Sequence, residues 1–520
     1  MFILKILIFR YNINMGGGLM QLVAYGAQDV YLTGNPQITF WKVTYRRYTN
    51  FAMESIEQTF NGQADFGRRV TCTISRNGDL AYRTYLQVTL PQIDQTLSAG
   101  NVYARWLDFP GHQLVSQVEV EVGGQRIDRQ YGDWMHIWCQ LTLSAEQQRG
   151  YYKMVGNTTQ LTYLTDPSFA DVNGPCGGNA PVNVCAPRNA LPETTLYIPL
   201  QFWYCRNPGL ALPLIALQYH EVKINLDLRP IDECLWAMKN LSETSSNQQV
   251  TAAYNQSLVA ASLYVDYIFL DTDERRRMAQ NPHEYLIEQL QFTGDESVGS
   301  SSNKIKLNFN HPCKEIVWVC QPDSNVDYCA AYTGGELLYK VYGAQPFNYS
   351  DAVDALPNSL HAFQSSGGAL VTISGDIFQD GPAVETAAVS ATDAATFVLG
   401  EAALDMHCWG ENPVVVAKLQ LNGQDRFSER EGTYFGDVQP FQHHTRAPDA
   451  GINVYSFALR PEEHQPSGSC NFSRIDNATL QLVLSNATVN GTNTAKVRVY
   501  ATNYNVLRVM SGMGGLAYSN

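Results

Sequence analysis

The feature that most constrains the fold is an internal repeat, in which three blocks recur in the same order in each half of the 520-residue chain. The paired blocks are Val118–Trp134 with Ala417–Phe435, Leu196–Leu228 with Val454–Leu484, and Leu263–Leu270 with Val497–Leu507. One matching Gly-Gln turn would carry no weight, whereas three ordered matches favour a duplication. The repeat therefore predicts two copies of one structural unit instead of a single large core.

The separation between matched residues shrinks along the chain, so the two halves differ in the connections between their blocks. The matched residues are Gly124 with Gly423, Tyr197 with Tyr455, and Tyr264 with Tyr500. The first half has longer connections in Asn157–Cys185 and around Ile231–Ala260, and the second has its excess in Gly343–Glu411. Because loops tolerate insertions better than strands do, we expect shared strands and unequal loops.

Short runs of alternating, β-branched and aromatic residues recur between clusters of Gly, Pro, Asn and Asp. They are Gln37–Tyr45, Tyr82–Leu90, Leu114–Val122, Glu221–Leu228, Leu263–Leu270, Lys304–Phe309, Glu315–Cys320, Val414–Leu421, Thr479–Leu484 and Lys496–Tyr504. The 29 Tyr and 21 Phe favour pleated, half-buried surfaces. Many short strands with turn signals predict an all-β fold of the sandwich or barrel class.

Two short helices are expected between the strands. Ser144 begins a capping-box spacing, and the helix that follows is predicted to run to about Met154. Asp271 caps a second helix through Met278, which ends before Asn281-Pro282. Because this second helix lies between the repeated halves, we interpret it as the hinge between two domains.

Charge and cysteine content narrow the class of protein. The net charge of −14 argues against a coat that grips nucleic-acid phosphates directly, because such a coat needs a basic face. Charged residues make up only 16%, against a typical value of about 25%, which suits a surface covered by copies of the same chain. The 11 Cys show no disulfide spacing, so free thiols in a cytosolic protein are expected.

The apolar segment Met1–Phe9 is too short to span a bilayer and lacks a cleavage site for a signal peptidase. Met15 resembles a second possible start. We interpret these first residues as a misplaced start or a flexible arm, with contact to a lipid surface as the alternative. Gly16-Gly17-Gly18 and Gly514-Gly515 do not link a strand to a helix, so flexible tails are expected there instead of phosphate-binding loops.

Several clusters could carry chemistry, but each has a simpler structural interpretation. The segment Pro461–Gly468 contains Glu462, Glu463 and His464, yet no nucleophile accompanies them, so a Pro/Gly-shaped turn is favoured. Neither His443-His444 nor the cysteines provide the two close ligand pairs that zinc prefers. The cysteines concerned are Cys313, Cys320 and Cys329. We therefore predict no catalytic residue, no metal ligand and no cofactor-binding residue.

Two further motifs also have a structural interpretation. His283-Glu284-Tyr285 lacks the second His of a zinc-protease helix. Arg46-Arg47 and Arg275-Arg276-Arg277 are interpreted as solvated faces with local carboxylate partners. The alternative is contact with other subunits or acidic partners, since Arg pairs with carboxylates in a bidentate manner.

Segments spread over most of the chain resemble the double jelly-roll major capsid proteins of nucleocytoplasmic large DNA viruses. They are Gln37–Glu54, Tyr131–Trp138, Tyr197–Tyr219, Tyr267–Thr293, His311–Val317, Leu421–Phe435 and Phe457–Asp476. In the last of these, Pro-Ser-Gly followed by Asn-Phe-Ser-Arg is the most specific motif. The resemblance covers about Met15 to Val509, apart from the long loops, and the residues before Met15 depart from the family's usual start.

The resemblance implies two consecutive eight-stranded jelly rolls, and hence a structural capsid subunit that is not an enzyme. The predicted domains are an N-terminal arm (1–26), a first jelly roll (27–272), the hinge helix (273–282), a second jelly roll (283–510) and a C-terminal tail (511–520). It also implies a homotrimer with a pseudo-hexagonal outline that tiles an icosahedral virion shell. Minor capsid proteins would be partners, an internal membrane would lie near the arm, and assembly would take place in the host cytoplasm late in infection.

Two other classes of function remain as alternatives. The polar loops Asn157–Cys185 and Gly343–Glu411 are compatible with a glycan-binding or host-attachment protein. A β-sandwich hydrolase would require carboxylates that converge in a cleft.

Overall fold

The computed structural model describes residues 17–98, 102–162, 191–239, 249–326, 344–351 and 410–518. The chain divides into two compact units, Met1–Asn50 and Phe51–Asn520. The described part of the first unit contains two short helices, α2 (Gly17–Val23) and α3 (Asp29–Thr33), neither of which buries a residue.

The strand predicted at Gln37–Tyr45 is wrong. This segment forms only the isolated bridge between Thr39 and Lys42, and Phe40 and Trp41 are exposed. An alternating pattern becomes a strand only when a neighbouring strand satisfies its backbone, and no such partner is described for this segment. Arg46-Arg47, which would end this strand if it formed, therefore lies outside any strand.

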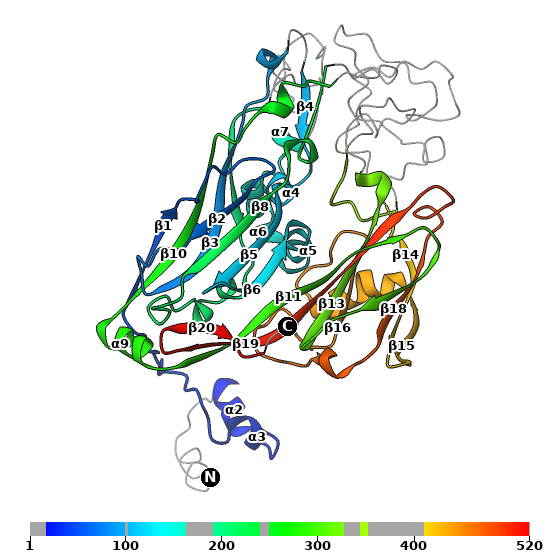
Figure 1. The fold of residues 1–520 in the computed structure, drawn as a ribbon. Coiled ribbons are helices and arrows are strands. Elements are labelled where there is room, and N and C mark those ends of the chain that lie inside the picture. The colour runs from blue at the N-terminus through cyan, green and yellow to red at the C-terminus, as the bar shows by residue number, and fades with distance from the viewer. Residues whose placement is uncertain are drawn as a thin grey trace, which may run out of the picture. The chain divides into compact units, whose positions relative to one another are not determined.

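The second unit begins with a sandwich of two four-stranded antiparallel sheets, the first jelly roll (Figure 1). One sheet has the order β1-β10-β3-β7 and the other β2-β8-β5-β6. The strands are β1 (Phe51–Gln58), β2 (Arg69–Thr73), β3 (Leu80–Leu90), β5 (Val115–Val122), β6 (Gln125–Tyr131), β7 (Thr194–Pro199), β8 (Val222–Leu228) and β10 (Ala260–Leu270). A separate pair, β4 (Tyr103–Trp106) and β9 (Leu235–Met238), joins two of its loops.

The second jelly roll repeats this order, with sheets β11-β19-β13-β16 and β12-β18-β14-β15. Its strands are β11 (His283–Val298), β12 (Ser302–Leu307), β13 (Pro312–Pro322), β14 (Val414–Leu421), β15 (Gln424–Glu431), β16 (Ile452–Ser456), β18 (Ala478–Leu484) and β19 (Ala495–Met510). Two short strands extend the first of these sheets, β17 (Cys470–Asn471) and β20 (Met513–Leu516). The predicted double jelly roll is confirmed.

The repeated blocks of the sequence occupy matching strands of the two jelly rolls. The first block is the hairpin β5–β6 in one half and β14–β15 in the other. Both hairpins turn through two residues with positive φ, Gly123-Gly124 and Asn422-Gly423, as a type I′ turn requires. The pairing of Tyr197 with Tyr455 is wrong in register, since Tyr197 is 40% exposed and Tyr455 is packed in the core.

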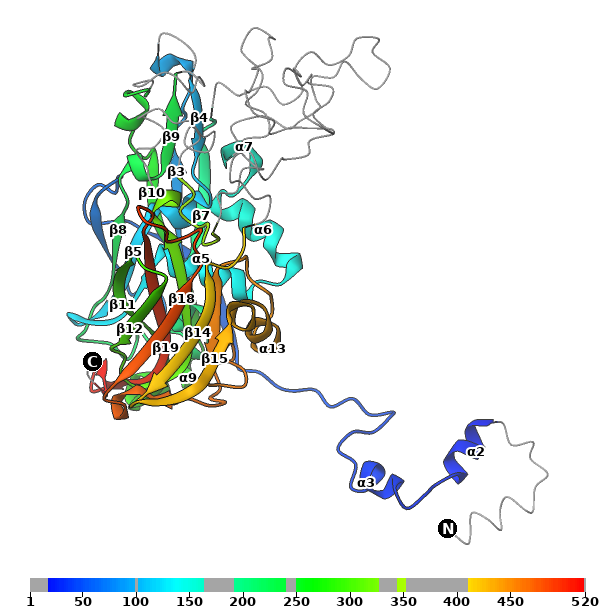
Figure 2. The same ribbon diagram turned by 90° about the vertical axis from the view of Figure 1, so that its right-hand side faces the viewer.

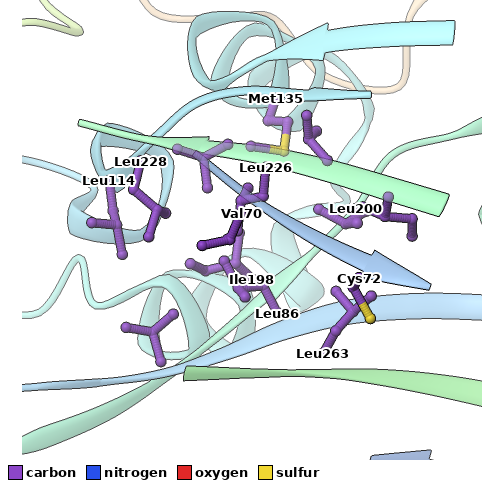
Figure 3. Packing of buried hydrophobic residues seen from close by; sticks show 14 of the residues in the cluster. Val70, Cys72, Leu86, Leu114, Met135, Ile198, Leu200, Leu226, Leu228 and Leu263 are labelled. Carbon is purple, nitrogen blue, oxygen red and sulfur yellow. The ribbon is translucent and has the colours of Figure 1, made fainter. Parts of the chain in front are cut away.

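Each jelly roll has its own hydrophobic core between its two sheets. In the first, alternate residues of facing strands meet, and Figure 3 shows Leu86, Ile198 and Leu263 from one sheet packed with Val70 and Leu226 from the other. In the second, Ile316, Trp318 and Val499 face Leu419 and Leu480. Burial of the residues of one period-2 face is what drives each sandwich to form.

The two predicted helices are confirmed. Helix α6 (Ala145–Val155) starts where the Ser144 side chain accepts a hydrogen bond from the Gln147 amide. Helix α9 (Thr272–Gln280) starts at Asp271, whose carboxylate accepts from the Thr272 amide. The structure adds helices that were not predicted, namely α4 (Pro110–Leu114), α5 (Gly132–Thr142), α7 (Thr159–Thr162), α8 (Trp203–Arg206) and α13 (Gln439–His443).

The predicted flexible tail at Gly514-Gly515 is wrong. These residues lie in β20, which pairs with β19, and the Gly514 backbone lies within hydrogen-bond distance of the His220 ring in the first jelly roll, with Nδ1 at 3.0 Å from the carbonyl oxygen and 3.2 Å from the amide nitrogen. The long connection Ile231–Ala260 contains β9, as a loop of the first jelly roll. Most of Asn157–Cys185 and of Gly343–Glu411 lies outside the described residues.

Candidate functional site

Among the residues weighed as metal ligands, Cys313 and Cys320 lie in the core of the second jelly roll. Burial raises the pKa of the Cys320 thiol to about 12, so it stays protonated. Cys329 lies outside the described residues. In the part of the chain that the structure describes, no group of three or more His, Cys, Asp or Glu side chains could hold a metal ion.

Two motifs that the sequence keeps separate, His443-His444 and Pro461–Gly468, meet in the structure. The buried His444 side chain lies 2.9 Å from Glu462 through Nδ1 and 2.9 Å from Glu315 of β13 through Nε2. Burial alone would lower the pKa of His444, but the two carboxylates raise it to about 9. The imidazolium therefore holds the loop that carries Glu462 against the sheet.

A second buried charge cluster lies where the two jelly rolls meet. Glu288 of β11 pairs with Lys314 of β13 at 2.7 Å, with Arg206 of α8 at 2.9 Å, and with His464 at 3.3 Å. Burial alone would raise the pKa of Glu288, but the hydrogen bond with His464 and the charges of Lys314 and Arg206 lower it to about 2. Arg206 belongs to the first jelly roll, where its guanidinium carbon lies 4.1 Å from the centroid of the Trp138 ring. Because Glu288 and Lys314 belong to the second jelly roll, the cluster ties the two sandwiches together.

Helix α5 supplies the apolar part of the same junction. Its side chains Trp134, Ile137 and Trp138 are buried against residues of β13, β16 and β19 that point away from the core of the second jelly roll. Those residues are Val317, Val319, Ile452, Val454 and Tyr500. The outer face of the sheet β11-β19-β13-β16 is thus covered by the first jelly roll.

Ion pairs and backbone hydrogen bonds close the edges of this junction. Asp133 of α5 pairs with Arg498 of β19 at 2.8 Å, and Arg498 also pairs with Asp295 at 3.0 Å. Burial alone would lower the pKa of Arg498, but these carboxylates raise it. Asp128 of β6 accepts a hydrogen bond from the Leu290 amide, and burial raises its pKa to about 7. The two jelly rolls are therefore joined by buried ion pairs and hydrogen bonds as well as by apolar contacts.

The corresponding sheet of the first jelly roll, β1-β10-β3-β7, presents a row of tyrosines on its outer face. Tyr85 stacks on Tyr264 with ring centroids 5.4 Å apart, and Tyr197 lies 6.2 Å from Tyr85. We call Tyr85, Tyr197 and Tyr264 the tyrosine face. Beside it lies a groove of about 910 Å³. Its lining includes Tyr85, Tyr197, Met154 of α6, Arg206 and Glu462.

The other residues that the sequence analysis considered for a functional role have structural partners or lie at the surface. Arg275 of α9 pairs with Asp79 at 3.0 Å, whereas Arg276 and Arg277 are exposed. The His283 ring lies 2.7 Å from the Met278 carbonyl oxygen, which joins β11 to α9. In the groove, both carboxylate oxygens of Glu462 are engaged by Thr445, and one also meets His444. These contacts hold structure in place.

The sequence analysis missed two surfaces, the α5 junction and the tyrosine face. A signal was present for the first, because Ile316–Cys320 is a continuous apolar run, which indicates a strand buried on both faces. The alternation in β3, where Tyr85 and Gln87 flank Leu86, indicates a strand with only one face in the core.

Comparison with known proteins matches each half of the chain to a family model. Residues 39–271 match the family model described as "Major capsid protein N-terminus", and residues 274–515 match "Large eukaryotic DNA virus major capsid protein". The major capsid protein of Phaeocystis pouchetii virus is 77% identical, covering 97% of this chain and all of the relative. The major capsid protein of Paramecium bursaria Chlorella virus 1 is 41% identical, again covering 97% of this chain and 100% of the relative.

Solved structures agree with these matches. The crystal structure of PBCV-1 VP54 has a TM-score of 0.62 at 36% identity, with 93% of this chain and 100% of that chain covered. The Faustovirus major capsid protein has the same TM-score of 0.62 at 14% identity, covering 94% of both chains, and so shows the fold alone.

Proposed function

Because the chain belongs to the major capsid protein family of large eukaryotic DNA viruses, we propose that three copies form its working unit, a homotrimer with a pseudo-hexagonal outline. The protein is a structural subunit of the virion shell and not an enzyme. The fold has the organisation that such a capsomer needs, since each chain contributes two jelly rolls of the same strand order.

The observation that carries this proposal is the buried junction between the two jelly rolls of the chain. Buried ion pairs at Glu288 and Arg498, together with the α5 contact, hold the two sandwiches as one block. Three such blocks around a threefold axis would place six similar sandwiches in a ring, and closed symmetry would keep every interface specific. Flexibly linked sandwiches would not define such a ring.

The mass of the purified protein in solution tests the proposal. Light scattering coupled to size exclusion should give three times the chain mass of 57.9 kDa. A species that stays at 57.9 kDa at high protein concentration would contradict the homotrimer. Negative-stain images of the same peak should show particles with a hexagonal outline.

Partners beyond the homotrimer belong to the same proposal. We infer that neighbouring capsomers and minor capsid proteins contact the assembled trimers, and that assembly takes place in the host cytoplasm late in infection. The first unit supports proximity to an internal membrane, because many of its apolar side chains are exposed, including Leu22, Phe40 and Trp41. None of the described helices has the length and apolar composition that crossing a membrane requires.

Vesicle flotation would test the membrane contact of the first unit. The full chain should float with vesicles, and a variant in which Phe40 and Trp41 are both replaced by Ser should float less. Equal flotation of the two proteins, or none by either, would contradict the contact.

A further inference from the structure

Two cysteines of the second jelly roll lie directly opposite each other on neighbouring strands. The antiparallel register pairs Cys313 of β13 with Cys470 of β17. Directly opposite residues of an antiparallel pair project from the same face, and their Cα atoms lie about 4.5–5.5 Å apart. A disulfide bond spans about 4.4–6.8 Å between Cα atoms. The backbone therefore holds the two cysteines at a separation that a disulfide can bridge.

The two side chains also belong to the same region of the core. Cys313 is fully buried in the core of the second jelly roll, and Cys470 is half-buried and packs against that core. Burial and the neighbouring Cys470 both raise the pKa of the Cys313 thiol, as is expected of two thiols that lie close together. Both cysteines lie in the sandwich whose strands β14, β15 and β18 face the viewer in Figure 2.

The arrangement distinguishes this pair from the other cysteines that the structure describes. Cys72 of β2 lies opposite Ile224, and Cys320 of β13 lies opposite Val497. Three more lie outside the strands, namely Cys139, Cys205 and Cys234. Cys320 provides a matched control, because it belongs to the same strand and the same core as Cys313 but has no cysteine opposite it.

A disulfide at this point would fasten a loop that buried charges already hold. The loop before β17 carries Glu462 and His464, which take part in the two buried charge clusters. Lys314 and Glu315, which lie on the other side of those clusters, directly follow Cys313 in β13. Strand β17 itself has only two residues, so few backbone hydrogen bonds hold the end of the loop. A covalent bond would therefore reinforce the part of the loop where the strand pairing is shortest.

We propose that Cys313 and Cys470 form a disulfide under oxidising conditions, which locks the loop before β17 onto β13. Reducing compartments such as the cytosol keep thiols reduced, so the bond forms once the protein leaves such a compartment. The loop can still adjust while the chain folds and assembles, and the finished shell gains a covalent link within each subunit. The inference goes beyond the proposed homotrimer, because the bond lies within one chain.

Oxidation by a low-molecular-weight disulfide such as glutathione disulfide proceeds in two exchanges. The thiolate of Cys470, the more exposed cysteine, attacks one sulfur of glutathione disulfide, forms a mixed disulfide and releases one glutathione thiolate. The thiolate of Cys313 then attacks the Cys470 sulfur and releases the second glutathione. Two protein thiols are oxidised, one glutathione disulfide is reduced to two glutathione molecules, and the two thiol protons end on the glutathione sulfurs.

Incubation of the folded full chain with glutathione disulfide tests the proposal. Digestion without reducing agent should yield a peptide pair joined through Cys313 and Cys470. Thiol titration after unfolding should show that Cys470→Ser loses two fewer of its thiols than the unsubstituted chain. The control Cys320→Ala should form the bond as the unsubstituted chain does. Because burial raises the pKa of both reacting thiols, the bond should form faster as pH rises.

The unfolding temperature measures the consequence of the bond. The oxidised unsubstituted chain should unfold about 3–6 °C above the reduced chain, because a cross-link restricts the unfolded state. A reducing agent should abolish this gain. Cys470→Ser and Cys313→Ala, which remove the bond from either side, should show no gain on oxidation, whereas Cys320→Ala should show all of it.

Three results would overturn the inference. Cys470 could stay reduced at alkaline pH, stop at the mixed disulfide with glutathione, or pair with a cysteine other than Cys313. None of these results bears on the homotrimer, which the mass of the protein in solution tests separately.

Discussion

His444 lies between two acidic side chains, and its ionisation is coupled to folding. Its pKa in the folded protein is about 9, above the ordinary value of 6.5. A group whose pKa rises on folding stabilises the protein fully below its unfolded pKa, and that contribution is lost as pH rises through the folded pKa. The stability supplied by His444 is therefore present below about pH 6.5 and lost towards pH 9.

We expect His444→Gln to lower the free energy of unfolding by about 3–5 kcal/mol below pH 6.5, since it removes the cation between Glu315 and Glu462. The deficit should shrink as pH rises through 9. Urea unfolding across this pH range measures both effects. The neighbouring His443→Gln should cost about 1 kcal/mol or less, because His443 makes only a surface hydrogen bond. A pH-independent deficit would contradict this role for His444.

Glu288 has the opposite dependence on pH. Its pKa of about 2 lies below the ordinary value of 4.5, so its contribution is present above about pH 4.5 and is lost as pH falls towards 2. Glu288→Gln leaves Lys314 and Arg206 without their buried counter-charge. We expect a loss of about 3–5 kcal/mol at neutral pH, measured by chemical unfolding.

The matched control for that substitution is Glu284→Gln on the same strand. Glu284 pairs with Arg508, and both side chains are more than half exposed. Exposed pairs contribute about 0–1 kcal/mol, so the change should be small. Equal losses for Glu284→Gln and Glu288→Gln would show that burial of the charge cluster is unimportant.

Among the secondary-structure elements, each helix that follows a hairpin begins at a glycine that has no room for a side chain. Gly132→Ala and Gly432→Ala should each destabilise the protein by about 1–3 kcal/mol, because the added methyl group meets a backbone carbonyl that cannot move away. The unfolding temperature measures this effect. Similar losses at the two positions would also support the equivalence of the two helices.

Gly150→Ala is the control for the glycine substitutions. Gly150 lies within α6, and no atom lies near the position that its Cβ would occupy. Because Ala favours a helix interior over Gly, this variant should gain about 0.5–1 kcal/mol. A loss at Gly150 as large as at Gly132 would show that a collision with a carbonyl is not the cause of the losses at Gly132 and Gly432.

For the molecule as a whole, the junction decides whether the two jelly rolls unfold together. Asp133 on α5 and Arg498 on β19 join them at 2.8 Å, with little exposure of either side chain. In a double-mutant cycle, Asp133→Asn and Arg498→Gln should show a coupling energy of about 0.5–3 kcal/mol. Calorimetry of the double variant should also show a broader transition or two transitions.

The control for this cycle is the pair Asp133→Asn with Glu284→Gln. Glu284 pairs with Arg508, which is not a partner of Asp133, so the two effects should add. Additive losses for Asp133 and Arg498 would contradict a direct interaction across the junction.

Much of the fold follows from local patterns in the sequence. Alternating residues such as those of β8 or β18 predict strands, and the Asn422-Gly423 turn predicts the hairpin between β14 and β15. Ser144 and Asp271 predict the first turns of α6 and α9. These features depend on backbone geometry and on neighbours close in sequence, so a linear pattern is enough to reveal them. The domain limits remain a prediction.

The sequence by itself determined the repeated strands, their turns and the class of fold, because these depend on periodicity and on residues with special backbone geometry. Only the tertiary structure decided which outer face is covered and which is left open. It also decided that His444 meets Glu315, residues that are 129 positions apart. Periodicity tells which residues share a face, but not what packs on that face. The segment Gln37–Tyr45 illustrates this limit, since its alternation is real and no strand is described beside it.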